Sequence, residues 1–298
     1  MAFPVTIANS YGTTTIKTKP TRVVTLGWGS QDAAIALGVV PVGMPRGTYG
    51  DVDGTYPWIT AALQGKPAPE LIDGTQIPFE KIVKLKPDVI LAVQSGLTRS
   101  EYTTLSKIAP TVSYPGKPWQ TPWRQQALVV GKALGLETKA KQLVASVDTK
   151  IAAAAKAHPE FAGKTFAYGG YTGDGNYSFY TAADARVQLV TDLGFTVAPG
   201  VTTLAGDTSS FYFEVSLEKV PQVASQVWIS SYDSESVHKQ ALANKVYATV
   251  PAVASGAEVA LIDKTFIMAT SAPSVLSVPW SLGTFVPMLA KAVGATIG

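Results

Sequence analysis

The residue types that most often carry catalysis and metal binding are scarce in this sequence. It contains no cysteine and only two histidines, His158 and His238. His158 precedes Pro159 at the end of a predicted helix, and His238 lies in a charged stretch, so neither belongs to a cluster of metal ligands. Without cysteine, thiolate catalysis, disulfide bonds and cysteine-built metal sites are excluded.

Sequence motifs of nucleotide-binding and hydrolytic sites are also absent. The chain has no Gly-x-x-x-x-Gly-Lys-Ser/Thr motif and no Gly-x-Ser-x-Gly motif. The glycine-rich stretch 169–175 is not followed by the helix start of a dinucleotide-binding fingerprint, so we interpret it as a flexible binding loop. A pair of carboxylates for glycoside hydrolysis stays an open alternative, although no cluster suggests one. We predict no catalytic residue, no metal ligand in the protein and no cofactor.

Aromatic, cationic and amide side chains gather instead in loops that follow predicted strands. The carboxyl ends of parallel strands meet at one edge of a sheet, where ligands bind. Aromatic rings with a few cations suit a bulky, partly apolar anion. Trp58 and Trp123 are assigned to the core, because each follows a proline into a helix start. The predicted ligand-binding residues are Trp28, Ser30, Arg46, Tyr49, Gln94, Trp119, Arg124, Tyr171, Tyr232 and Trp280.

Alternating strand and helix patterns supply these loops in the first half of the chain. The residues 5–20 alternate around Tyr11-Gly12 and predict a β-hairpin. Ser30 is expected to cap the first helix, Thr121 a later one, and 45–76 is interpreted as irregular loop. Strands are predicted near 22–28, 39–44, 88–93 and 111–114, and helices near 30–38, 78–86, 99–108 and 122–134.

A long amphipathic helix at 138–157 separates this half from a second α/β pattern. Its apolar residues recur on one stripe, and ~20 residues at ~1.5 Å each span ~30 Å. We predict two Rossmann-like α/β lobes, 1–137 and 159–298, joined by a single long backbone helix at 138–158, with a ligand cleft between the lobes. In the second lobe, strands are predicted at 164–171, 195–200, 258–263 and 266–269, and helices at 184–194, near 237–247 and at about 280–293. The stretch 216–231 is predicted to form a helix followed by a strand.

One phrase of sequence occurs in both halves. The stretch 77–93, IPFEKIVKLKPDVILAV, aligns without a gap with 215–231, VSLEKVPQVASQVWISS, so that Glu80 falls on Glu218. A second pair of similar stretches is LGVVPVG in the first half and LGFTVAPG in the second. Each copy of the first phrase predicts a short helix followed by a buried strand, so the lobes are expected to share a plan.

Composition fits a protein with large cores. Of 298 residues, 46% are apolar and 15% are charged, which excludes disorder. No window reaches the ~18 apolar residues of a membrane span, and the first residues show no export signal, so one has been removed or never existed. Residues 1–137 carry 13 Lys and Arg against 9 Asp and Glu, whereas 159–298 carry 7 against 11. The excess of positive charge in the first half suits an anionic small ligand. An uneven distribution of charged residues over the solvated surface explains this excess equally well.

Together the phrases RVVTLGWGSQDAAIALGVVPVG, PFEKIVKLKPDVILA, DARVQLVTDLGF and SLEKV resemble the substrate-binding proteins of iron–siderophore, heme and cobalamin ABC importers. The resemblance covers nearly the whole chain. It implies a protein, periplasmic or anchored to the cell surface by a lipid, that captures a ferric siderophore between two lobes. The iron enters as a preformed chelate, and the protein acts as a monomer without chemistry of its own. Heme or a corrinoid is the alternative ligand, and an enzyme acting on the chelate is the alternative from another class.

The resemblance also implies roles for three charged residues. Glu80 and Glu218 match the glutamates, one on each lobe, that dock onto arginines of the permease. A first-turn carboxylate is also favoured by the helix dipole, by ~0.3–1 kcal/mol, but this does not explain its repetition in both lobes. Arg186 matches an arginine that faces the ligand. Some relatives carry a further arginine before the Phe-Glu or Leu-Glu phrase, where this chain has Gln76.

Overall fold

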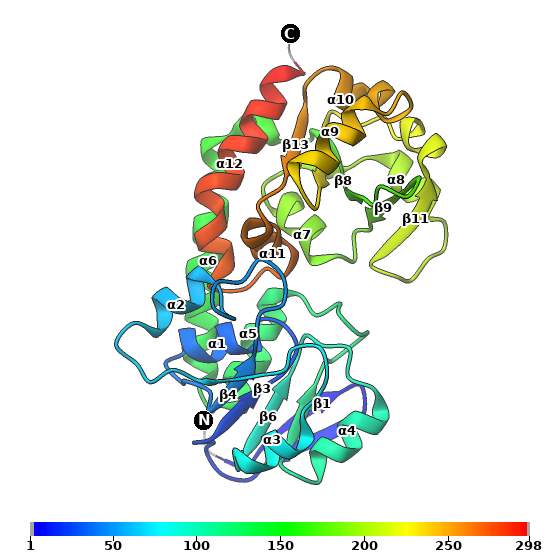
Figure 1. Cartoon of the computed structure of the whole chain (residues 1–298). Helices are drawn as coiled ribbons and strands as arrows, with labels where there is room; N and C mark the ends of the chain where they lie inside the picture. The colour runs from blue at the N-terminus through cyan, green and yellow to red at the C-terminus, as the bar shows by residue number, and fades with distance from the viewer. Residues whose placement is uncertain (1–2, 297–298) are drawn as a thin grey trace. The chain divides into compact units, whose positions relative to one another are not determined.

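A computed structural model describes residues 3–296 of the chain. These residues form two compact units, whose elements are labelled in Figure 1. The first unit extends to Asp148 and also contains Ala272–Trp280. The second contains Thr149–Ser271 and the chain from Ser281 onward. The boundary between the units falls within the helix predicted at 138–158, after Asp148, and a short segment late in the chain packs with the first unit.

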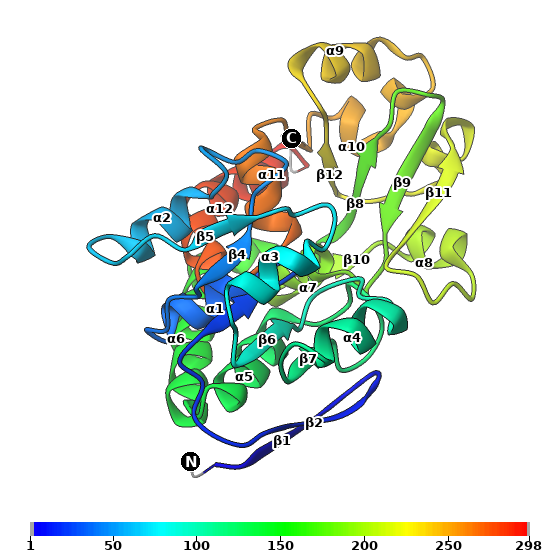
Figure 2. The ribbon, with the colours of Figure 1, turned by 60° about the horizontal axis from the view of Figure 1, so that its bottom comes forward.

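The first unit is built on a parallel sheet with the strand order β5-β4-β3-β6-β7. Its central strands β3 and β6 are buried along their whole length, as their continuous apolar sequences predict. The predicted hairpin is confirmed as β1 and β2, which lie beside β7 and α5 (Figure 2). The strands are β1 (Val5–Asn9), β2 (Gly12–Ile16), β3 (Val23–Thr25), β4 (Gly43–Pro45), β5 (Glu70–Ile72), β6 (Val89–Ala92) and β7 (Thr111–Ser113).

Short helices connect these strands and cover the sheet. Ile82 of α3 and Leu105 of α4 are buried in one cluster with Val24 and Ile90 of the sheet. The helix α4 begins with a capping box, in which Thr98 and Glu101 each accept a hydrogen bond from the other's backbone. The helices are α1 (Ser30–Ala36), α2 (Pro57–Leu63), α3 (Phe79–Lys84), α4 (Arg99–Ser106) and α5 (Trp123–Ala133).

The second unit has a mixed sheet with the strand order β11-β9-β8-β12-β13. The strands β8, β12 and β13 are parallel, and β10 pairs in parallel with the start of β8. The strand β9 pairs antiparallel with β8, and β11 pairs antiparallel with β9. Trp228, Tyr232 and Tyr247 belong to its buried core. The strands are β8 (Thr165–Tyr171), β9 (Asn176–Tyr180), β10 (Thr196–Val197), β11 (Tyr212–Ser216), β12 (Val227–Ser231) and β13 (Glu258–Leu261).

The helices of the second unit are mostly short, and two longer helices run across the boundaries of the units along the chain. The short elements are η1 (Pro159–Phe161), α7 (Ala185–Asp192), α8 (Pro199–Ala205), η2 (Leu217–Gln222), α9 (Glu235–Ala243), η3 (Tyr247–Thr249), α10 (Pro251–Ala254) and α11 (Lys264–Ser271). The longer ones are α6 (Glu137–Ala157) and α12 (Ser277–Ala295). In the described part of the chain, no helix has the length and apolar character needed to cross a membrane.

The repeated phrase occupies matching places in the two sheets but does not form the same helix. Its strands β6 and β12 both lie inside their sheets, each between two parallel neighbours. The second pair of similar stretches also corresponds, since β4 pairs with β3 and β10 pairs with β8. The first copy forms the α-helix α3, whereas the second forms the 3₁₀-helix η2. Pro221 lies inside η2 and has no N–H to donate to the carbonyl of Leu217, so an α-helical turn cannot close there.

Several local predictions are wrong for identifiable reasons. The region 45–76 contains α2 and β5, and 266–269 belongs to the helix α11 rather than to a strand. The stretch 169–175 forms the end of β8 and the turn into β9, because Gly173 and Gly175 supply positive φ angles. Neither Ser30 nor Thr121 caps a helix: Gly29 and Pro122 hold those positions.

A buried carboxylate ties the late segment to the first unit. Asp32 of α1 accepts hydrogen bonds from Trp58 Nε1 at 2.9 Å and from Ser274 Oγ at 2.5 Å. Its other oxygen has no partner within residues 3–296. Burial raises the pKa of Asp32 to about 6, because it outweighs the hydrogen bonds from Ser274 and Trp58, which lower the pKa. The hydrogen bond between Asp32 and Ser274 therefore joins residues that are 242 positions apart in the chain. Near neutral pH this contact requires a buried negative charge, which is unfavourable.

We predict that Asp32 makes the protein less stable as the pH rises from about 4 to about 6. The carboxyl of the unfolded chain has its ordinary pKa of 3.8, whereas the pKa of the folded one is about 6. The free energy of unfolding falls across this window by roughly 3 kcal/mol, at ~1.4 kcal/mol per pH unit. Urea unfolding of Asp32→Asn at pH 4.5 and pH 7.5 should lack this component. The exposed Asp207→Asn is the control, and equal pH dependence of both variants would contradict the assignment.

Candidate functional site

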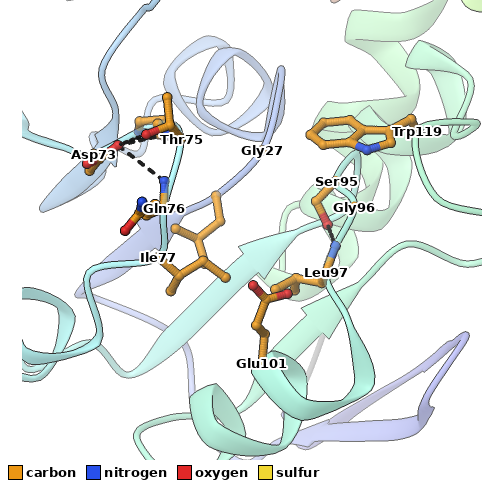
Figure 3. A pocket seen from close by; sticks show the side chains of 13 residues that line it. Gly27, Asp73, Thr75, Gln76, Ile77, Ser95, Gly96, Leu97, Glu101 and Trp119 are labelled. Atoms are coloured by element: carbon orange, nitrogen blue, oxygen red, sulfur yellow. Dashed lines mark hydrogen bonds between the residues drawn. The ribbon is translucent and has the colours of Figure 1, made fainter.

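The loops at the carboxyl edge of the first sheet enclose a pocket of ≈ 190 Å³ (Figure 3). Residues that follow β3, β5 and β6 contribute to it, together with Pro45 at the end of β4 and Trp119 after β7. This is the edge at which open α/β sheets bind ligands, because consecutive loops converge there. The pocket is lined by Leu26, Gly27, Pro45, Asp73, Gly74, Thr75, Gln76, Ile77, Ser95, Gly96, Leu97, Glu101 and Trp119.

The floor of the pocket depends on a close backbone approach at Gly27. Its φ is 72°, and a Cβ atom at this position would collide with the carbonyl oxygen of Gln94 and with Ser95. Glycine is therefore required there for two reasons, the left-handed backbone and the space. Next to it, the Trp28 N–H donates to the Gln94 carbonyl at 2.8 Å. The turn after β3 is thus fixed directly onto the loop after β6.

Trp119 forms one wall of the pocket in a strained backbone conformation. Its φ is 59°, which is rare for a bulky residue and is typical of functional sites. The Trp119 N–H donates to the Ser95 carbonyl at 3.1 Å, and the Trp119 carbonyl accepts from Gln94 Nε2 at 3.1 Å. A Cβ atom on Gly96 would collide with the indole, so the ring lies directly against that loop. The loop after β6 holds Trp119 in place.

A second tryptophan stands beside it. The ring centroids of Trp28 and Trp119 are 4.8 Å apart, and Trp28 is 39% exposed. Gln126 of α5 donates to the Trp28 carbonyl at 2.5 Å. The two indoles therefore form one apolar surface beside the pocket, and their contact with a ligand stays a prediction.

Polar and acidic side chains line other parts of the pocket, with Asp73 across from Trp119 and Glu101 beside Leu97 (Figure 3). Asp73 Oδ1 accepts from the Thr75 N–H and hydroxyl, both at 2.7 Å, and from the Gln76 N–H at 3.2 Å. These bonds, the Thr75 hydroxyl first, lower the pKa of Asp73 below its usual value. Glu101 Oε2 accepts from the Thr98 N–H at 2.7 Å and its hydroxyl at 2.8 Å. Each carboxylate is positioned by its own loop or helix start.

No sequence pattern marks these polar residues as one group. Asp73 and Thr75 fall in the region that the sequence predicts as irregular loop, and no motif marks Glu101. Gln76 stands where some relatives carry an arginine, which by itself does not place it at a pocket. The signal that could have found Asp73 is the three-residue strand β5 before it, which is too short to stand out from its proline-rich surroundings.

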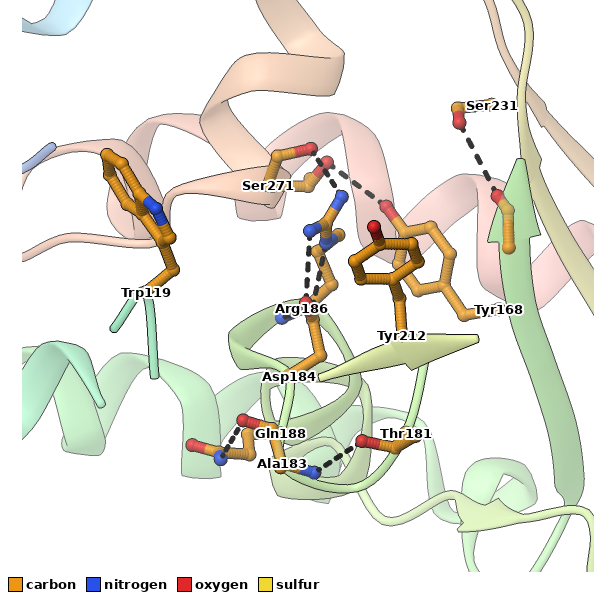
Figure 4. Close-up of polar contacts among 12 residues, drawn as sticks. Trp119, Tyr168, Thr181, Ala183, Asp184, Arg186, Gln188, Tyr212, Ser231 and Ser271 are labelled. Carbon is orange, nitrogen blue, oxygen red and sulfur yellow. Dashed lines mark hydrogen bonds and ion pairs between the residues drawn. The ribbon is translucent and has the colours of Figure 1, made fainter. Parts of the chain in front are cut away.

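Arg186 in the second unit is engaged by its own neighbours rather than left free (Figure 4). Its Nε and Nη2 donate to the two oxygens of Asp184 at 2.8 and 3.0 Å, and its guanidinium lies 3.6 Å from the ring centroid of Tyr180. Burial alone would lower the pKa of Arg186, but the Asp184 carboxylate and Tyr180 raise it. The side chain is charged, only 12% exposed, and neutralised by a buried partner.

Other predicted ligand residues are buried or paired in the same way. Ser30 is fully buried, with its Oγ accepting from the Val93 N–H. Tyr232 is 1% exposed, and its hydroxyl bonds to Tyr247 and to Glu258, so it stabilises the core of the second unit. Both side chains are thus packed inside their units, and their contact with a ligand stays a prediction. Gln94 is 7% exposed and acts by positioning Trp119.

The remaining predicted ligand residues lie nearer the surface. Arg46 is exposed and Tyr49 is half-buried in the loop after β4. Arg124 pairs with Asp148 of α6 at 2.6 Å. Tyr171, at the end of β8, is half-buried, with its ring centroid 5.5 Å from that of Tyr247. Trp280 is 40% exposed and packs against Trp58, with the ring centroids 5.2 Å apart. Their contacts with a ligand stay predictions.

Both predicted docking glutamates are exposed at the start of their short helices. Glu80 lies in the first turn of α3, and Glu218 in the first turn of η2. The lysine shared by the two phrases has a local role in the first copy, since Lys81 Nζ donates to the Leu71 carbonyl at 2.8 Å and pairs with Glu70 at 3.1 Å. The glutamates have no such structural partner between residues 3 and 296, which leaves them available to another molecule.

Comparison with known proteins gives the class to which these features belong. The sequence model of the periplasmic binding protein family matches residues 23–264. The chain therefore belongs to the periplasmic binding protein family. Within residues 3–296, no group of three or more His, Cys, Asp or Glu side chains is arranged to hold a metal ion.

Particular relatives and one solved structure are similar to the chain. The achromobactin-binding periplasmic protein of Dickeya dadantii (strain 3937) is 35% identical over 132 residues, 44% of this chain and 41% of that protein. The Fe(3+) dicitrate-binding periplasmic protein FecB of Escherichia coli (strain K12) is 33% identical over 111 residues, 37% and 35% of the two chains. The matches thus span less than half of either relative. The structure of PiaA from Streptococcus pneumoniae TIGR4 in complex with ferrichrome is 30% identical, with a TM-score of 0.89 over 98% of this chain and 99% of that one.

We predict that Trp119→Gly is more stable than Trp119→Ala, the reverse of the usual order. Alanine keeps the left-handed strain of roughly 1–2 kcal/mol, whereas glycine relieves it. Elsewhere in a loop, glycine is less favourable than alanine by ~0.4–1 kcal/mol. Urea-unfolding midpoints measure the order. Trp28, which lies outside the left-handed region, provides the control pair, and the same order at both positions would contradict strain at Trp119.

Proposed function

We propose that this chain is an extracytoplasmic substrate-binding protein that captures a ferric siderophore and delivers it to the permease of an ABC importer. Membership of the periplasmic binding protein family supports a binding role. The pocket at the carboxyl edge of the first sheet, walled by the strained Trp119, is the observation that carries the proposal. The similar structure in complex with ferrichrome supports an iron chelate as the ligand.

Several finer points of this function are inferences from the same family. The iron is cargo and enters within its chelate, so the chain needs no metal ligand or enzymatic cofactor of its own. We infer a location outside the cytoplasm because relatives are named periplasmic proteins. A monomeric state, a lipid anchor and a ligand position between the two lobes stay predictions.

We predict that ferric siderophores quench the intrinsic fluorescence of the purified protein. The chain contains 6 tryptophans, of which Trp119 lines the pocket and Trp28 packs against Trp119. Titration with ferrichrome and other ferric siderophores should give saturable quenching, and the recovered ligand should keep its mass. Titration with heme should leave the Soret band unshifted. A heme-induced shift without siderophore binding would favour the heme alternative, and an altered ligand mass would favour an enzyme.

We further predict that replacing both Glu80 and Glu218 with alanine abolishes uptake and leaves ligand affinity unchanged. The two side chains are exposed and contact nothing at the pocket, so their loss removes only contacts with a partner. Uptake of radiolabelled ferric siderophore by cells that carry the importer measures the first effect, and fluorescence titration measures the second.

Glu235→Ala provides the matched control for this experiment, because Glu235 is also an exposed carboxylate in the first turn of a helix. All three carboxylates have the same favourable interaction with a helix N-terminus, ~0.3–1 kcal/mol. Uptake should survive in Glu235→Ala. Reduced ligand affinity in the double variant, or normal uptake, would remove the docking assignment.

A further inference from the structure

The charges around the pocket limit the kind of chelate that it accepts. We propose that the ligand is a neutral or cationic ferric tris-hydroxamate, rather than an anionic ferric catecholate or ferric citrate complex. The inference rests on the proposed function and narrows its substrate class. It also reverses the expectation of an anionic ligand that the basic first half of the sequence suggested.

The pocket lining carries negative charge and no cation. Asp73 and Glu101 are among the lining residues, which include no lysine, arginine or histidine. Each carboxylate places one oxygen on backbone and hydroxyl donors of its own loop. Over the described residues, the second oxygen of each accepts no hydrogen bond, and it is available to a donor on a ligand. An anionic chelate would meet two carboxylates here without a compensating charge.

The cationic side chains of the first unit that are closest in sequence to the pocket-lining residues contact other groups or do not line the pocket. The Arg99 guanidinium lies 5.0 Å from the ring centroid of Tyr11. Arg46 and Lys117 are exposed in the loops after β4 and β7, and neither lines the pocket. Arg124 is paired with Asp148. The basic excess of the first half is therefore not concentrated at its pocket.

The carboxyl edge of the second sheet is acidic as well. Asp174 follows β8, Asp233 follows β12 and Asp263 follows β13, with Lys264 directly after it. Arg186, the residue expected to meet an anion, is neutralised by the two oxygens of Asp184. Taken by itself, the second sheet thus carries more carboxylates than cations along its carboxyl edge.

Hydroxamate chemistry matches these surroundings. Each hydroxamate loses one proton on binding iron, so three of them cancel the charge of Fe³⁺ and the chelate is neutral. A pendant ammonium or amide N–H can then donate to the unused oxygens of Asp73 and Glu101. Each catecholate loses two protons, so a tris-catecholate complex stays anionic, and citrate complexes carry further carboxylates. The indoles of Trp28 and Trp119 suit the uncharged body of such a chelate.

The test compares ferric chelates of different charge on the full chain by fluorescence titration. The probes are ferrichrome, ferrioxamine B with its free ammonium group, a ferric tris-catecholate and ferric citrate. We expect the two hydroxamates to bind at least about tenfold more tightly than the anionic chelates. Added salt should weaken only the cationic one, because screening acts on its attraction to the carboxylates.

Two conservative variants test the carboxylates directly. Asp73→Asn keeps the acceptor for its turn, and Glu101→Gln keeps the capping box, so both should fold. Each should weaken ferrioxamine B about fivefold, leave ferrichrome within about twofold, and strengthen the tris-catecholate about fivefold. Glu235→Gln is the control, and thermal unfolding verifies that the variants fold.

Opposite results would overturn the inference without touching the proposed function. The inference would be overturned if the tris-catecholate or the citrate complex bound most tightly. It would also be overturned if the two variants bound ferrioxamine B and the tris-catecholate with the same affinities as the wild type. Loss of anionic binding in Arg46→Gln would show that an exposed arginine governs the site instead. If no ferric chelate of any charge binds, the proposed function itself fails, and this inference fails with it.

Discussion

The contact between the turn after β3 and the loop after β6 is the constraint on which the pocket depends. These strands are parallel neighbours, so their loops leave the sheet at the same edge. Only a glycine in the left-handed region lets the backbone at Gly27 lie against the carbonyl of Gln94. From that contact, Gln94 reaches Trp119 and Ser95 accepts the Trp119 N–H. The ring wall of the pocket is therefore supported from the centre of the sheet.

The same support explains how a bulky residue persists with a positive φ. Left-handed backbone costs an L-residue about 1–2 kcal/mol, which the surrounding hydrogen bonds and ring contacts must offset. Trp119 has bonds to its N–H and its carbonyl, and its ring packs on Trp28 and on the Gly96 backbone. Such a site is shaped before a ligand arrives, so less ordering free energy is spent on binding.

The two units differ in how their charged side chains are paired. In the second unit, Asp184 and Arg186 neutralise each other in a buried bidentate pair, because an unpaired guanidinium there would be costly. In the first, Asp73 and Glu101 are held by backbone donors, which leave their charge intact. An arginine in the sequence is thus no evidence for an anion site, since its partner decides whether its charge is available.

The sequence by itself determined the α/β class, the hairpin, the central strands β3, β6, β8 and β12, and the family resemblance. Continuous apolar runs, helix-stop glycines and repeated phrases are local signals, and local physics suffices to recognise them. Only the tertiary structure decided that Ala272–Trp280 packs with the first unit, that Ser30 and Tyr232 are buried, and that Asp73 faces the pocket. Burial and pairing are set by residues far away in the chain, as Asp32 and Ser274 show, and no local pattern encodes which partner arrives.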